Sequence, residues 1–199
     1  MSSLRAVAIC AAGVLTLPIN AFAKTPSACA APITGAYTNE DYGFSFVVPT
    51  GLTGRWQSPC TVDETGACVC LGNHGPAFDL DSSSVLAVFA DYAADLDDPT
   101  LGDVLRGALD RIAGEEGGPA VHITAVESFR LRGRGGYRIR ATAEATDERN
   151  AIPGYERVEY IFYARGVRCV IYLRSPRVTF TNYSRYLDSL LKSWKWTSN

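Results

Sequence analysis

The residues best suited to chemistry lie in one short segment, which holds Cys60, Cys68, Cys70 and His74. Thiolates with an imidazole can hold zinc or cuprous copper, and a Cys70 thiolate beside His74 could act as a nucleophile. The spacing C-x7-C-x-C-x3-H matches no standard zinc pattern. We therefore expect no metal and no cofactor, and keep a metal-handling or redox role for this segment as the alternative.

The start of the chain bears on the state of these cysteines. Residues 1–23 are typical of a secretory signal, with Arg5, an apolar run that ends at Leu17, and an Ala-x-Ala cleavage site that ends at Ala23. The apolar run is shorter than a membrane span. We expect a periplasmic or secreted protein without an integral membrane segment after cleavage, and an oxidising compartment favours disulfides.

Five of the six cysteines follow this signal, so one of them should stay unpaired. Cys169 lies on the apolar side of a predicted central strand, and we interpret it as a buried free thiol. The four others then form two disulfides in one of three connectivities. Cys68 and Cys70 should take different partners, because a bridge between them would be strained. The disulfide residues are therefore Cys29, Cys60, Cys68 and Cys70.

No other pattern in the chain indicates catalysis. His122 falls on the polar side of a predicted strand, and the aspartates after residue 90 have no EF-hand spacing. A phosphate loop, a serine-hydrolase elbow and informatively spaced carboxylates are all missing from the sequence. The formal net charge of −2 does not indicate a class of partner, and we expect no nucleic acid. We therefore predict that the protein is not an enzyme.

The element around which the rest of the chain is organised is a predicted run of four antiparallel strands between Ala120 and Arg174. Apolar and polar residues alternate from Arg157 to Ala164 and again after Arg165-Gly166, which suits a two-residue turn. This register places Phe162 opposite Cys169 and collects the apolar residues on one face.

The first two strands of this meander follow the same pattern. Residues 121–131 and 137–143 should pair across the turn Gly133-Arg134-Gly135-Gly136. Glu127 alone falls on the apolar face, which fits a frayed edge. The polar face then gathers the arginines of both hairpins, with two tyrosines among them.

The remaining elements complete an α+β fold with a single antiparallel sheet, built on the four-stranded meander and flanked by two helices. We predict strands at 43–48 and 85–90, a helix capped by Thr100 and ended by Gly114–Gly118, a helix at 182–192, and a closing strand at 193–196. Residues 24–36 form an irregular lead-in, 37–199 a single domain, and 54–83 a cysteine-rich loop.

Three local motifs stand out, namely Tyr42-Gly-Phe-Ser-Phe46 with Pro49 and Gly51, Asp98-Pro-Thr-Leu101, and Leu190-Leu-Lys-Ser-Trp-Lys-Trp196. Together they resemble the PsbP-like family of photosystem II extrinsic proteins and their bacterial relatives. The resemblance implies a PsbP-like domain with a binding or assembly role and carries over no catalytic residues. The cysteine-rich loop departs from the family pattern.

We therefore expect an exported, non-catalytic binding or assembly protein, of which an immunity-type inhibitor of a toxin is one version. Seven arginines on the polar face outnumber Glu144 and Glu159, so one end of that face should stay open to an acidic protein surface. The expected partner-binding residues are Arg130, Arg132, Arg138, Arg140, Tyr163 and Tyr172.

Overall fold

A computed structural model of the chain describes residues 32–56, 61–62, 68–69, 75–81, 83–92, 99–116, 121–144, 154–164 and 166–197. Its strands are β1 (Ala36–Asn39), β2 (Phe44–Val47), β3 (Arg55–Trp56), β4 (Thr61–Val62), β5 (Cys68–Val69), β6 (Pro76–Asp81), β7 (Ser84–Tyr92), β8 (Val121–Leu131), β9 (Arg134–Ala143), β10 (Tyr155–Ala164), β11 (Val167–Pro176) and β12 (Lys195–Trp196). Its helices are α1 (Leu101–Glu116) and α2 (Arg177–Ser193).

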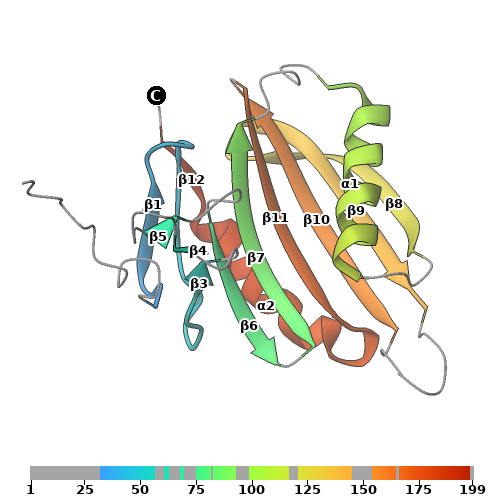
Figure 1. Cartoon of the computed structure of the whole chain (residues 1–199), viewed down its shortest axis with the longest axis horizontal. Helices are drawn as coiled ribbons and strands as arrows, with labels where there is room; N and C mark the ends of the chain where they lie inside the picture. Colours follow the sequence, from blue (N-terminus) through green and yellow to red (C-terminus); the bar gives the residue numbers. More distant parts are fainter. Residues whose placement is uncertain are drawn as a thin grey trace, which may run out of the picture.

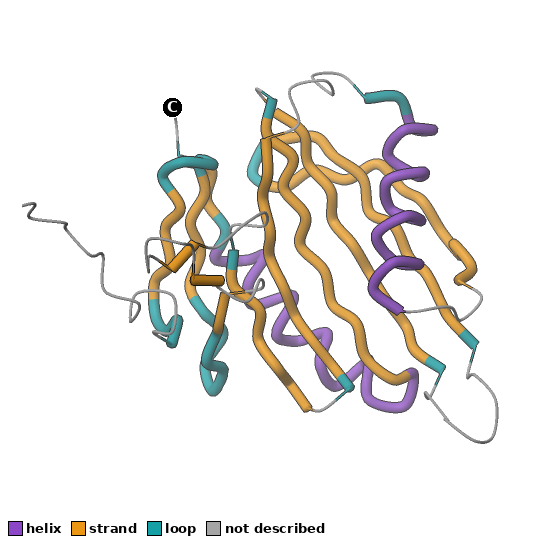
Figure 2. The backbone as a smooth tube through the Cα atoms, in the orientation of Figure 1, coloured by secondary structure: helices purple, strands orange, loops and turns teal. Residues whose placement is uncertain are grey.

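The strands form more than one sheet. A seven-stranded antiparallel sheet has the order β3-β6-β7-β11-β10-β9-β8, a second sheet has the order β1-β2-β12, and β4 pairs with β5. Helix α1 lies over one face of the large sheet and α2 over the other (Figures 1 and 2). The predicted α+β class with two helices is confirmed. The predicted single sheet is wrong, because the first strands and the last strand pair with each other instead of joining the meander.

The second half of the meander has the predicted register. Ala164 lies opposite Val167, and Phe162 lies opposite Cys169, which is a buried free thiol. Burial raises the pKa of the Cys169 thiol far above its ordinary value. The thiol therefore stays protonated and packs as a small apolar side chain.

The first half of the meander differs from the prediction. The turn between β8 and β9 consists of Arg132 and Gly133, both with positive φ, and not of residues 133–136. Positive φ at both central residues is the type I′ arrangement that suits the twist of a hairpin. A register shift between Ile123 and Ala125 then displaces one part of β8 against β9. Arginine gives no sequence signal for positive φ, whereas the neighbouring glycines suggested a later turn.

Both faces of the large sheet are covered, which decides where its polar residues lie. Along β10, Tyr160 and Phe162 face α2, whereas Ile161 packs in the cluster below α1. Ile139 of β9 packs with Ile161, so the apolar residues of the two hairpins do not share one face. Ile161 lies opposite Tyr137 of β9, which fixes this offset.

The small sheet closes the core on the α2 side. Trp194 is fully buried, and its ring stacks on Phe44 at 4.9 Å and on Phe46 at 5.5 Å between centroids. The amide of Val47 donates to Ser193 Oγ at 3.0 Å, across 146 positions of sequence. The segment that follows α2 therefore packs against the first strands of the domain.

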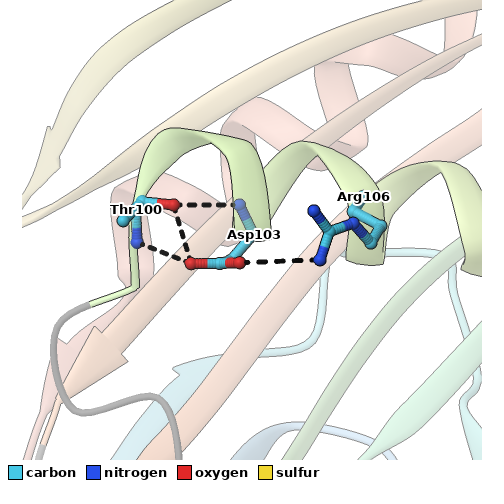
Figure 3. A network of polar contacts seen from close by, with 3 residues as sticks. All are labelled: Thr100, Asp103 and Arg106. Carbon is cyan, nitrogen blue, oxygen red and sulfur yellow. Dashed lines mark hydrogen bonds and ion pairs between the residues drawn. The ribbon is translucent and has the colours of Figure 1, made fainter.

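The helix starts follow their local chemistry. Thr100 caps α1: the Asp103 amide donates to Thr100 Oγ1 at 3.3 Å, and Thr100 Oγ1 donates to the Asp103 carboxylate at 2.7 Å (Figure 3). Helix α2 begins at Arg177, five residues before the predicted start at Asn182. Pro176 precedes it with φ −49°, and no side chain caps this end. A helix without a polar cap gives little signal in a sequence.

The cysteine-rich segment is not a plain loop. Strand β6 joins the large sheet beside β7, and β3 pairs with β6, so the predicted loop at 54–83 is wrong over these residues. Thr61 lies opposite Val69 in the β4–β5 pair. Cys29, Cys60, Cys70 and His74 lie outside the described residues, and Cys68 is described by its backbone alone, so the disulfide and metal hypotheses stay predictions.

Candidate functional site

The six predicted partner-binding residues do not share a face of the sheet. Arg130 and Tyr163 line a groove on the α1 side, and Arg132 lies in the β8–β9 turn. Arg138 and Arg140 lie opposite Tyr160 and Val158, which puts both arginines on the α2 side. The expectation of one polar face is therefore wrong, since the alternating apolar residues of β9 face α1, whereas those of β10 face α2.

Several arginines have carboxylate partners that the sequence pattern did not assign. Glu127 pairs with Arg138, and Asp91 of β7 pairs with Arg168, whose Nε donates to Oδ1 at 2.9 Å. Hydrogen bonds to Tyr160 and Glu127 raise the pKa of the Arg138 guanidinium. Glu127 therefore has a structural partner at the sheet edge, and its place among apolar residues is explained.

Arg157 forms a fully buried polar pair with Glu159. Their side chains are 0% and 1% exposed, with Arg157 Nη2 2.7 Å from the Glu159 carboxylate. The Arg157 guanidinium also stacks over the Tyr172 ring at 4.0 Å. Tyr172 is buried, so it belongs to the interior and lies outside the candidate surface. Each of the two side chains neutralises the charge of the other in the low-dielectric interior, where an unpaired charge would be costly.

The first candidate site is a groove at the start of α1, of about 550 Å³, which we call the α1-side groove. Its lining residues come from β8, β9 and β10, and from Pro99, which precedes the helix cap Thr100. Arg130 is exposed there and donates from Nη1 to the Gly133 carbonyl at 3.1 Å. The lining residues are Pro99, Ser128, Phe129, Arg130, Gly135, Gly136, Tyr137 and Tyr163.

Two adjacent glycines shape this groove in different ways. A Cβ at Gly135 would meet nothing within 4 Å, so this position opens into free space. A Cβ at Gly136 would lie 2.3 Å from the Ile161 carbonyl oxygen, so only glycine fits beside β10. Bare backbone thus forms part of the groove, between an arginine and the half-buried rings of Tyr137 and Tyr163. The arrangement can accept an anionic group together with an apolar or planar one.

A second groove, of about 560 Å³, lies on the other side of the same hairpin, and we call it the α2-side groove. Trp196 donates from Nε1 to the Leu131 carbonyl at 2.8 Å, and Arg134 stacks over its ring at 3.9 Å. These contacts hold the end of the chain against the β8–β9 turn. The lining residues are Val47, Arg132, Lys192, Ser193, Trp194, Lys195 and Trp196.

Sequence reasoning missed most of the α2-side groove. It assigned Arg132 to a partner surface, but it treated Leu190–Trp196 only as a structural motif. Lys192 and Lys195 sit on either side of the buried Trp194, and this alternation of lysine and tryptophan is the signal that was available.

Metal-ligating groups do not gather in the part of the chain that the structure describes. Groups of three or more histidine, cysteine or carboxylate side chains are not found among those residues. His122 is exposed on β8, the edge strand of the large sheet. Within the described ranges, neither helix is long and apolar enough to cross a membrane.

Comparison with known proteins identifies the fold. No protein-family model matches the chain, and no curated protein matches its sequence. The cyanobacterial PsbP (CyanoP) of Synechocystis sp. PCC 6803 superposes with a TM-score of 0.54 at 18% identity, over 84% of this chain and 93% of that one. The Ran-binding protein Mog1p of Saccharomyces cerevisiae gives a TM-score of 0.51 at 10% identity, over 84% and 97%. The chain has a PsbP-like fold, as its motifs predicted.

Proposed function

We propose that this chain is a non-catalytic binding or assembly protein that acts after export, and that its partner docks in the α1-side groove. The observation that carries the proposal is that the exposed Arg130 and the half-buried Tyr163 line the same groove, together with the backbone of Gly135 and Gly136. Arginine and tyrosine are enriched where proteins contact each other.

The charge of the groove favours an acidic surface on the partner. Arg130 is the single charged residue among those that line it. The carboxylates that neutralise other arginines, Glu127 and Asp91, are engaged with Arg138 and Arg168. A carboxylate of the partner could take both outer nitrogens of Arg130, with the tyrosine rings beside it.

The fold adds support of a general kind. The yeast neighbour is described as a Ran-binding protein, so this architecture does serve protein recognition in one case. A toxin that the chain neutralises in the periplasm is one partner of the expected type.

Capture of partners from a periplasmic extract on the immobilised, exported protein tests the proposal. Arg130→Glu reverses the charge of the groove, and Gly135→Leu adds a side chain at the position where a Cβ would meet no atom within 4 Å. The matched control is Arg185→Glu, an equal charge change at an exposed position of α2.

We expect both groove variants to lose the captured protein, at least tenfold at low salt, and the control to retain it. Arg130→Glu should also slow association and weaken its dependence on salt. If Arg130→Glu and Gly135→Leu retain as much of the captured protein as the control does, this groove is not the docking site. Export is tested separately by the mass of the secreted chain, which we expect to begin at Lys24.

A further inference from the structure

The α2-side groove carries an uncompensated positive charge. Arg132, Lys192 and Lys195 line it, and none of its lining residues is acidic. Among the described residues, none of these three cations forms an ion pair. Three cations around one groove repel each other, and an anion between them relieves that repulsion.

Apolar surface lies next to these charges. Val47 is 52% exposed at the mouth of the groove, and Trp196 is half-buried beside it. Trp194 is fully buried, and its indole N–H has no hydrogen-bond partner within the described part of the chain. An apolar floor below a ring of cations suits a chain segment that alternates acidic and apolar residues.

The backbone of Arg132 is held in a conformation that arginine disfavours. Its φ is 49°, and it is the single non-glycine residue with positive φ among those described. Glycine or asparagine would adopt this turn position more readily. The guanidinium donates to the Lys192 carbonyl at the end of α2, so the turn places an arginine on the rim of the groove.

We infer that the α2-side groove is a second binding site, separate from the α1-side groove, and that it takes an acidic peptide segment of a partner protein. The carboxylates of the segment lie between Arg132, Lys192 and Lys195, and its apolar side chains contact Val47 and Trp196. The two grooves lie on opposite sides of the β8–β9 hairpin, so one partner or two can occupy them.

The indole N–H signals of the three tryptophans provide a direct test by NMR. The probe is a blocked hexapeptide, Glu-Leu-Glu-Asp-Leu-Glu, and its uncharged control is Gln-Leu-Gln-Asn-Leu-Gln. We expect the acidic peptide to shift the Trp194 and Trp196 signals saturably, and to bind at least tenfold more tightly than the control. Trp56, in β3 at the opposite edge of the large sheet from β8, serves as the reference.

Two variants distinguish an effect on peptide affinity from an effect on the stability of the fold. Lys195→Gln removes one cation outside the turn. It should lower the affinity for the peptide about fivefold, which corresponds to the loss of one exposed charge pair. Arg132→Asn introduces a residue that adopts positive φ more readily than arginine, and it should weaken peptide binding similarly without lowering thermal stability. Arg106→Gln, on helix α1 at the opposite face of the large sheet, should leave peptide affinity unchanged.

Several results would overturn the inference. Equal affinity of the acidic and uncharged peptides would do so, as would a Trp56 shift as large as that of Trp196. If Arg132→Asn lowers stability and leaves peptide affinity unchanged, the arginine serves only to cap α2.

Discussion

The adjacent glycines of β9 should respond in opposite ways to the same substitution. An alanine at Gly136 places its Cβ 2.3 Å from the Ile161 carbonyl oxygen and 2.6 Å from Phe162 Cδ1. Ordinary carbon–oxygen contacts begin at about 3.3 Å, so the shortfall is roughly 1 Å. The carbonyl belongs to a strand paired on both sides and cannot move alone.

The magnitude follows from two opposing effects. Overpacking of this kind costs about 1–3 kcal/mol. Alanine also restricts the unfolded chain, which offsets about 0.4–1 kcal/mol where the native conformation is allowed. Gly136→Ala should therefore lower the free energy of unfolding by about 1–2 kcal/mol. Gly135→Ala meets no atom within 4 Å and should be neutral or gain up to about 1 kcal/mol.

Urea unfolding followed by tryptophan fluorescence measures the contrast. For a domain of this size, with a slope of roughly 2–3 kcal/mol/M, the two midpoints should differ by about 1 M. The slopes themselves should stay equal, because neither change alters the surface exposed on unfolding. Equal midpoints for the two alanine variants would refute the assigned register of β9 on β10.

Three further predictions concern other parts of the molecule. Cys169→Ser should melt below Cys169→Ala in thermal scans, because a buried hydroxyl without a partner costs about 1–3 kcal/mol; equal melting temperatures would contradict the burial of this position. Burial raises the pKa of Asp81, but hydrogen bonds from Ser83, Tyr183 and Ser84 outweigh it and lower the pKa to about 2. The stability that the carboxylate adds is therefore present above its unfolded pKa and is lost as pH falls toward 2. Asp81→Asn should be less stable than the parent at pH 7 and equal to it near pH 2 in urea titrations, and a gap that persists at pH 2 would count against this assignment. Non-reducing peptide mapping should find two bridges among Cys29, Cys60, Cys68 and Cys70, and Cys169 reduced; a bridge that includes Cys169 would contradict its assignment as the free thiol.

Local sequence patterns predicted the helices and strands better than they predicted the face of the sheet on which each side chain lies. The β10–β11 hairpin was predictable because strict alternation on both sides of a two-residue turn leaves one register. Helix α1 was predictable because Thr100 and the following apolar stripe give both its start and its buried side. In each case the decisive residues are neighbours in sequence.

The candidate site depended on contacts that no local pattern carries. The offset between β9 and β10 sends Arg138 to the α2 side, and the alternation within a single strand does not specify this offset. Asp91 reaches Arg168 only because β7 lies beside β11, across a gap of 77 positions. The placement of Arg132 needs a positive φ that arginine rarely adopts. Sequence reasoning therefore found the arginines but not their neighbours.

The pairing of β2 with β12 makes the segment that follows α2 a condition for completing the fold. Trp194 packs against both Phe44 and Phe46, so the core on the α2 side stays open until the segment that follows α2 has been synthesised. Contacts of this sequence separation form late, because loop closure must precede them. A nascent chain that lacks its last turn of helix and its last strand exposes a row of aromatic rings. Apolar surface that is exposed in this way favours aggregation until the last strand pairs.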